Sequence, residues 1–206
     1  MRKNSLALQS VVFCALLFSS GCFSVPNSPS PRFHMLSSVD KEEVIQKFNI
    51  PPYIIIETGP VKIPDYQNRP QMVTLNKDKT LNFAQFDRWG EALDSAMARL
   101  INESLTAMLP GATFQMFPCN FNIPLKYQLI VDVLQLESEL DKEVFFSAQW
   151  SIIDVETKKM AYSKRSEFRQ PIDPHNYTGM ANALSAVCAS LSREVAQEFE
   201  LLTKQL

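Results

Sequence analysis

One stretch, Phe86-Asp87-Arg88-Trp89-Gly90-Glu91-Ala92-Leu93, predicts the start of a long amphipathic helix that ends at Leu109. Asp87 is the expected N-cap, because its carboxylate can accept a hydrogen bond from an unpaired backbone N–H of the first turn. Glu91 would then lie in that turn, where the helix dipole favours negative charge. Such a helix places its apolar residues on one face: Trp89, Leu93, Met97, Leu100 and Met108. Another layer of the fold must cover this face.

The segments on both sides of this helix predict a β-sheet. Apolar and β-branched runs of strand length occur at residues 32–37, 53–57 continuing at 61–63, 71–75, 113–117, 126–136, 144–153 and 160–168. A second long helix follows, with Asp173 as the expected cap and Pro174 in its first turn. These elements predict an α+β fold: a two-layer α/β sandwich with a mixed, mostly antiparallel sheet and two long amphipathic helices on one face.

Residues 1–21 have the composition of an export signal. A basic start, Arg2-Lys3, precedes an apolar run that is too short to span a bilayer, which needs about 20 residues. Cys22 follows the small residues Ser19-Ser20-Gly21 directly, which resembles the cleavage site of bacterial lipoproteins, although that site usually has Leu where Ser19 stands. Cys22 is therefore the candidate lipidation site. The alternative is an ordinary cleavage site that leaves a free cysteine.

The sequence after the cysteine predicts a short tether and then one folded domain. Residues 22–32 contain three prolines among polar residues, so we expect an extended tether of about 30 Å. Residues 33–206 are the expected single domain. Phe23 follows the cysteine where Asp would favour the inner membrane, so by resemblance to the bacterial sorting pattern we expect a lipid-anchored protein of the outer membrane that faces the periplasm.

Charge and composition argue against several classes of function. Removing residues 1–21 leaves 18 basic and 22 acidic residues, a net charge of −4, which is unfavourable for binding nucleic acid. No Gly-rich nucleotide-binding motif occurs, and the only histidines are His34 and His175. We therefore expect no cofactor, no metal and no enzymatic activity. The acidic residues between two predicted strands are typical of a solvated turn rather than of a calcium loop: Glu137, Glu139, Asp141 and Glu143.

Two questions about individual side chains stay open in the sequence. Cys119 and Cys188 are the thiols that remain in an oxidising compartment, so they either form a disulfide or are two buried small residues. Trp89 either belongs to the core or forms a binding patch with Arg88, and the core is the interpretation that we favour.

Two separated stretches resemble a known family, the PqiC/YmbA-like auxiliary lipoproteins of ABC-type transport systems. Residues 61–73 resemble that family's strand, Pro-x-Tyr turn, Arg-Pro-Gln and second strand. Residues 86–93 resemble its Arg-Trp-x-Glu-Pro-Leu helix start, with Ala92 in place of the proline. The resemblance implies a periplasm-facing lipoprotein that works with an inner-membrane complex, whose MCE-domain protein forms a tunnel for lipids.

Two functional hypotheses follow. In the first, the protein is a non-enzymatic accessory subunit that docks the MCE-domain tunnel protein through a polar, aromatic turn and the neighbouring helix start, with the partner-binding residues Asp65, Tyr66, Arg69, Arg88 and Glu91. In the second, the gap between the helices and the sheet is a cavity that binds a lipid or another small molecule.

Overall fold

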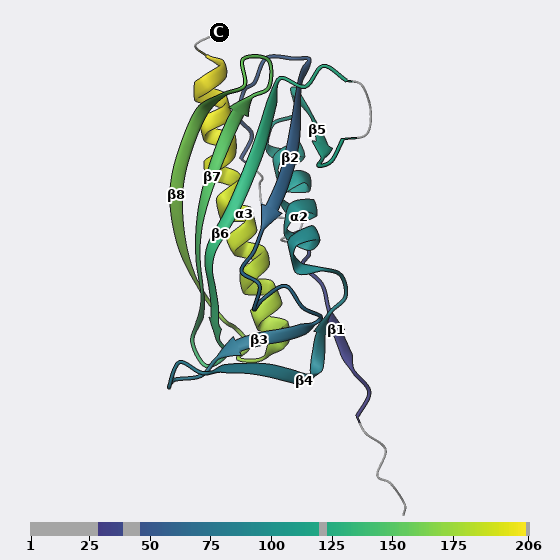
Figure 1. The fold of residues 1–206 in the computed structure, drawn as a ribbon, viewed down its shortest axis with the longest axis vertical. Coiled ribbons are helices and arrows are strands. Elements are labelled where there is room, and N and C mark those ends of the chain that lie inside the picture. Colours follow the sequence, from purple (N-terminus) through teal and green to yellow (C-terminus); the bar gives the residue numbers. More distant parts are fainter. Residues whose placement is uncertain (1–28, 39–45, 120–122, 205–206) are drawn as a thin grey trace, which may run out of the picture. The chain divides into compact units, whose positions relative to one another are not determined.

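The computed structural model describes residues 29–38, 46–119 and 123–204, and within them it contains eight strands and two helices (Figure 1). In chain order these are β1 (Arg32–His34), β2 (Ile54–Lys62), β3 (Gln71–Leu75), β4 (Leu81–Trp89), α2 (Leu93–Met108), β5 (Ala112–Met116), β6 (Tyr127–Glu139), β7 (Glu143–Asp154), β8 (Lys159–Pro171) and α3 (Tyr177–Thr203). None of the described helices is long and apolar enough to cross a membrane.

The larger sheet has five strands in the order β5-β2-β6-β7-β8. β2 pairs in parallel with β5 and β6, whereas β6, β7 and β8 form long antiparallel pairs. Both helices lie on the same side of this sheet (Figure 1). The predicted α+β fold is therefore confirmed. Strands were expected at all five of these places, and β2 joins two predicted pieces through an irregularity between Thr58 and Val61.

The core fills the layer between the helices and the five-stranded sheet. Trp150 of β7 and Phe199 of α3 are fully buried, and the Trp150 indole N–H donates to the Ser166 hydroxyl at 2.9 Å. Phe199 lies against Tyr127 of β6, with 5.9 Å between the ring centroids. Burying each such side chain contributes about 1.5–3 kcal/mol, so this layer supplies most of the stability of the fold.

A second sheet, of three strands in the order β1-β4-β3, was not expected. β1 pairs in parallel with β4, and β3 pairs with β4 in the antiparallel sense. Residues 81–89 are therefore a strand, and α2 begins only at Leu93, after Ala92, which makes no side-chain cap bond. The prediction that Asp87 caps the helix was wrong. Trp89 is 5% exposed, in agreement with a role in the core.

The cap of the second helix also differs from the prediction. α3 begins at Tyr177, and the side chain of Asn176 accepts a hydrogen bond from the Gly179 N–H at 2.9 Å. Asn176 is thus the N-cap, and Asp173 lies outside the helix. A Cβ at Gly179 would collide with the carbonyl oxygen of Pro174. Because the loop before α3 crosses its first turn here, the position requires glycine.

The chain before β2 also packs against both helices. Arg99 of α2 donates to the Leu36 carbonyl at 3.0 Å, and the Ser37 N–H donates to Ser185 of α3 at 3.3 Å. Further along, the Phe48 N–H donates to the Met108 carbonyl at 2.8 Å. Leu36 and Phe48 are both buried. The residues that flank 39–45 therefore attach to both helices.

The two cysteines after the predicted leader lie in different surroundings. Cys188 is fully buried in α3 and carries a thiol, and burial raises its pKa to about 12. Cys119 is half-buried, and its N–H donates to the Glu57 carboxylate at 2.8 Å. Cys188 thus packs in the core as a small side chain.

Candidate functional site

The five predicted partner-binding residues all lie beside the three-stranded sheet. Asp65, Tyr66 and Arg69 occupy the turn between β2 and β3, Arg88 lies in β4, and Glu91 precedes α2. The turn is joined to the end of β4, because the Trp89 N–H donates to the Pro70 carbonyl at 2.8 Å and Arg88 pairs with Gln71. The structure does bring these segments together, but their side chains have different tasks.

Tyr66 holds the turn against the larger sheet. Its hydroxyl donates to the Leu136 carbonyl at 3.0 Å and accepts from the Leu136 N–H at 3.4 Å. The neighbouring Gln67, 1% exposed, donates to the same carbonyl at 2.9 Å. Burial is the main cause of a raised pKa of Tyr66. Tyr66 therefore positions the turn rather than presenting a free aromatic ring.

Glu91 is also engaged within the chain. Its carboxylate pairs with Arg99 at 2.6 Å, and the same guanidinium binds Glu103 at 3.2 Å and the Leu36 carbonyl. The hydrogen bond from Glu91 is the main reason that the pKa of Arg99 is raised. Glu91 thus joins the start of α2 to the chain that follows β1.

Arg69 and Arg88 remain as candidates for direct contact with a partner. Arg69 is exposed, and its guanidinium lies 4.5 Å from the centre of the Phe83 ring, which is itself 44% exposed. Arg88 is half-buried and pairs in register with Phe33 on one side and Gln71 on the other. Within the part of the chain that the structure describes, no carboxylate forms an ion pair with either arginine, and the buried Arg88 Nε has no hydrogen-bond partner.

We call this part of the three-stranded sheet the outer face: Arg69, Phe83 and Arg88, with Asp65 exposed at its margin. Unpaired guanidinium groups beside exposed rings can bind carboxylates and apolar groups together, because arginine uses both its charge and its flat face. The face contains no nucleophile or histidine base.

The most strongly bonded group of this region is one that no sequence pattern indicated, the Asp87 carboxylate. Asp87 is 4% exposed, and it accepts two hydrogen bonds from Arg32, at 2.9 and 2.7 Å, and one from His34 Nε2 at 2.8 Å. Burial acts to raise the pKa of Asp87, and the hydrogen bonds from Arg32 and His34 outweigh it, so the pKa is lowered. No local pattern indicates this cluster, since its members are separated by more than 50 residues.

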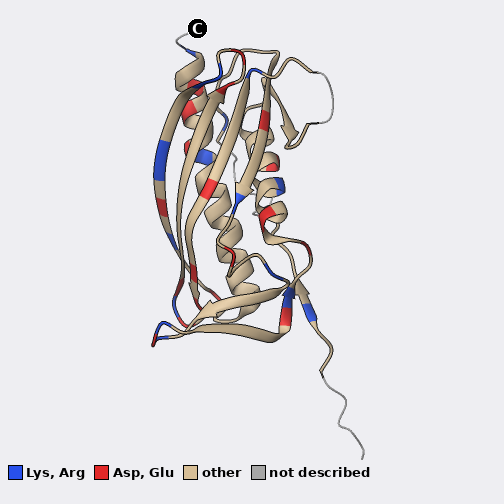
Figure 2. Ribbon diagram, in the orientation of Figure 1, with Lys and Arg blue, Asp and Glu red and all other residues tan. Residues whose placement is uncertain are grey.

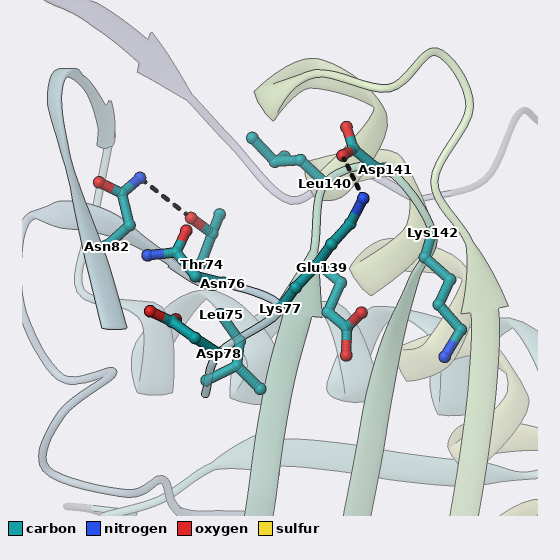
Figure 3. Close-up of a pocket in the computed structure, with 10 residues that line it drawn as sticks. All are labelled: Thr74, Leu75, Asn76, Lys77, Asp78, Asn82, Glu139, Leu140, Asp141 and Lys142. Atoms are coloured by element: carbon teal, nitrogen blue, oxygen red, sulfur yellow. Dashed lines mark hydrogen bonds and ion pairs between the residues drawn. The ribbon is translucent and has the colours of Figure 1, made fainter. Parts of the chain in front are cut away.

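A hollow of about 760 Å³ lies between the β3–β4 turn and the β6–β7 turn (Figure 3). Lys77 points at Asp141 across it, at 4.0 Å, and Lys79 pairs with Glu139 at 3.6 Å. These acidic residues thus belong to an exposed, ion-paired turn, as expected. Among residues 29–38, 46–119 and 123–204, no group of three or more His, Cys, Asp or Glu side chains is arranged to hold a metal ion.

The layer between the helices and the sheet gives no support to a lipid-binding cavity. Its side chains are buried and in mutual contact, including Leu105, Leu129, Phe146 and Leu191, each of which has no exposed surface. Four surface hollows lie at turns, over strands β6 to β8 and at the start of α3, and none of the four is lined by residues of both helices.

Comparison with known proteins identifies the family. Residues 36–196 match the model of the ABC-type transport auxiliary lipoprotein component, so the chain belongs to this family. This is a family of transport components and not of enzymes, and its members are lipoproteins that serve an ABC transport system.

Solved structures share the fold. One, described only as an uncharacterized protein, has 18% sequence identity and a TM-score of 0.64, and the match covers 82% of this chain and 99% of that one. Protein XCC0632 from Xanthomonas campestris has 9% identity and a TM-score of 0.60, covering 86% of this chain and 95% of that one. No curated protein matches the sequence significantly.

Proposed function

We propose that this protein is a non-catalytic accessory subunit of an ABC transport system, anchored to the outer membrane by lipid on Cys22, which docks the system's MCE-domain tunnel protein. The family membership supports a transport role. The observation that carries the docking proposal is the outer face, where Arg69 and Arg88 have no ion-pair partner in the described chain while Phe83 is exposed. Arginine and aromatic side chains are enriched at surfaces that a protein partner covers.

The five docking residues divide into two kinds. Arg69 and Arg88 would contact the partner, with Asp65 at the edge of the contact. Tyr66 and Glu91 are positioning residues, because their bonds to Leu136 and Arg99 fix the turn and the start of α2. A partner segment that fits this face would offer a carboxylate beside an apolar side chain.

Charge reversal tests the docking surface. We expect Arg69→Glu to reduce co-purification of the MCE-domain protein by about tenfold or more, because it puts a like charge opposite the expected carboxylate. Lys159→Glu is the matched control, since Lys159 is exposed on β8 and the change in charge is the same. Equal recovery of the MCE-domain protein with both variants would exclude this face as the docking site.

A further inference from the structure

The edge of the three-stranded sheet presents three large side chains to solvent. Phe33 is 66% exposed, Met35 is 60% exposed, and the side chain of Arg32 is 70% exposed. We call these residues the β1 margin. An exposed apolar patch that is rimmed by polar residues is a candidate for contact with a protein or a membrane.

The β1 margin is fixed to the fold and is not part of a loose end. Asp87 binds Arg32 and His34, and the Gly90 N–H donates to the His34 carbonyl at 2.8 Å. Met35 lies directly over Gly90, where an added Cβ would be 3.1 Å from Met35 Cγ. Along the strand, Phe33 points to the face opposite from its two neighbours, which are the residues that bind Asp87. Its ring is thus held outward.

The chain outside this margin leads straight to the candidate lipid site. Only nine residues lie between Cys22 and Arg32, and when extended they reach about 30 Å. A group tethered at this distance meets the bilayer surface at an effective concentration in the millimolar range. Even a weak attraction between the β1 margin and lipid would then be sufficient for contact.

We infer that the β1 margin is a membrane-contacting surface, with Phe33 and Met35 entering the headgroup boundary of an anionic bilayer. Arg32 stays bound to Asp87 through Nε and Nη2, and its remaining N–H groups face lipid phosphates. Aromatic and apolar side chains flanked by arginine have the composition of interfacial contacts, and a second signal beside a lipid chain strengthens anchoring. The inference rests on lipidation of Cys22 and not on docking of the tunnel protein.

Binding of the unacylated protein to vesicles tests the attraction itself. The mature chain with Cys22→Ser is mixed at low salt with vesicles of phosphatidylethanolamine and phosphatidylglycerol. We expect it to bind, and the added pair Phe33→Ser and Met35→Ser to lower the partition coefficient about tenfold. The control pair is Leu134→Ser and Met160→Ser, which are 50% and 61% exposed on the larger sheet. No binding by the parent chain, or an equal loss with both pairs, would overturn the inference.

Fluorescence in the acylated protein tests the placement. Trp89 and Trp150 are buried, so a tryptophan introduced by Phe33→Trp can be observed against them, with Met160→Trp as the control. We expect brominated phospholipid to quench the additional emission of the first variant and not that of the second. Equal quenching would contradict a contact at the β1 margin. If Phe33→Ser with Met35→Ser abolished recovery of the MCE-domain protein and left vesicle binding unchanged, the margin would belong to the protein partner instead.

Discussion

At the scale of single residues, Asp87 shows how one buried carboxylate organises a region. The carboxylate receives hydrogen bonds from Arg32 and His34, which belong to the first strand of the chain. A buried charge is tolerated when it is paired and hydrogen-bonded, and removing it leaves its partners without a counter-charge. Asp87 therefore fixes β1 to β4, and with it the orientation of Phe33.

Neutralising this carboxylate should make stability less dependent on pH. The folded-state pKa of Asp87 is lowered, so its contribution is present above the unfolded value near 4 and is lost as pH falls through the folded value. We expect Asp87→Asn to cost about 2–3 kcal/mol at pH 7, and markedly less at pH 3. Urea unfolding at the two pH values measures the difference.

Asp65→Asn is the control for that experiment, because Asp65 is exposed and forms no ion pair with the described residues. It should change stability by less than about 0.5 kcal/mol at either pH. A loss for Asp87→Asn that was the same at pH 7 and pH 3 would show that shape, and not charge, is what matters at this position.

At the scale of elements, the two helix starts show which sequence signals were misleading. Acidic residues preceded both predicted helices, yet Asp87 lies within a strand and Asp173 lies in the loop before α3. The cap of α3 is Asn176, whose side chain binds the Gly179 N–H. Asp87 and Asp173 were predicted as N-caps because each precedes a run of apolar residues at helical spacing. An N-cap also requires a backbone conformation that turns into the helix, and the spacing of apolar residues does not determine it.

Alanine substitutions should separate the true cap from the predicted one. Asn176→Ala removes the hydrogen bond to the first turn of α3 and should cost about 1 kcal/mol. Asp173→Ala should change the free energy of unfolding by less than about 0.5 kcal/mol. Chemical denaturation of both variants measures this, and a larger loss for Asp173→Ala would mean that Asp173 stabilises the loop in a way that its position does not indicate.

Most strands could be predicted because their patterns are local. Residues 71–75 form β3 as expected, and the alternation in residues 144–153 predicted β7, whose inward side chains include Phe146 and Trp150. β4 was missed because Trp89 continues the helical spacing of Leu93 and Met97 although it lies at the end of a strand. Its neighbour in the sheet, β1, is 55 residues away, and pairing at that distance leaves no periodic signal.

The structure brings the residues of the candidate site together, and it gives two of them roles that differ from the expected ones. The family resemblance directed attention to the turn at 64–70 and to Arg88, which do lie together. It could not show that Tyr66 and Glu91 are bonded within the chain, because Leu136 and Arg99 approach them only in the folded structure. The Asp87 cluster required three-dimensional contacts in the same way.

At the scale of the whole molecule, charges are spread over the described part of the chain, with acidic and basic residues on both the sheets and the helices (Figure 2). Many are paired, as in Lys126 with Asp154 at 2.9 Å and Arg169 with Glu143 at 2.6 Å. Such exposed pairs contribute little to stability. Because so many charges are paired, Arg69 and Arg88 stand out as cationic side chains that have no ion-pair partner in the described chain.

Lipidation of Cys22 is the prediction on which the position of the protein in the cell depends. Radiolabelled palmitate should be incorporated into the wild type and not into Cys22→Ala, because a thiol is needed to accept the first lipid. Cys188→Ala is the comparison, since Cys188 is buried in α3 and its label should equal that of the wild type. Equal labelling of Cys22→Ala and the wild type would show that Cys22 is not the site of lipidation.

The attachment of β1 also has a mechanical consequence. The segment that leads to Cys22 enters the fold at Arg32, so tension on the anchor loads first the three-residue pairing of β1 and the ion pairs of Asp87. Their release would free residues 32–35 and lengthen the free tether by about 13 Å of contour, at about 3.3 Å per residue. The pull would then stop at Leu36, which is buried, while the five-stranded sheet and its helices stay folded.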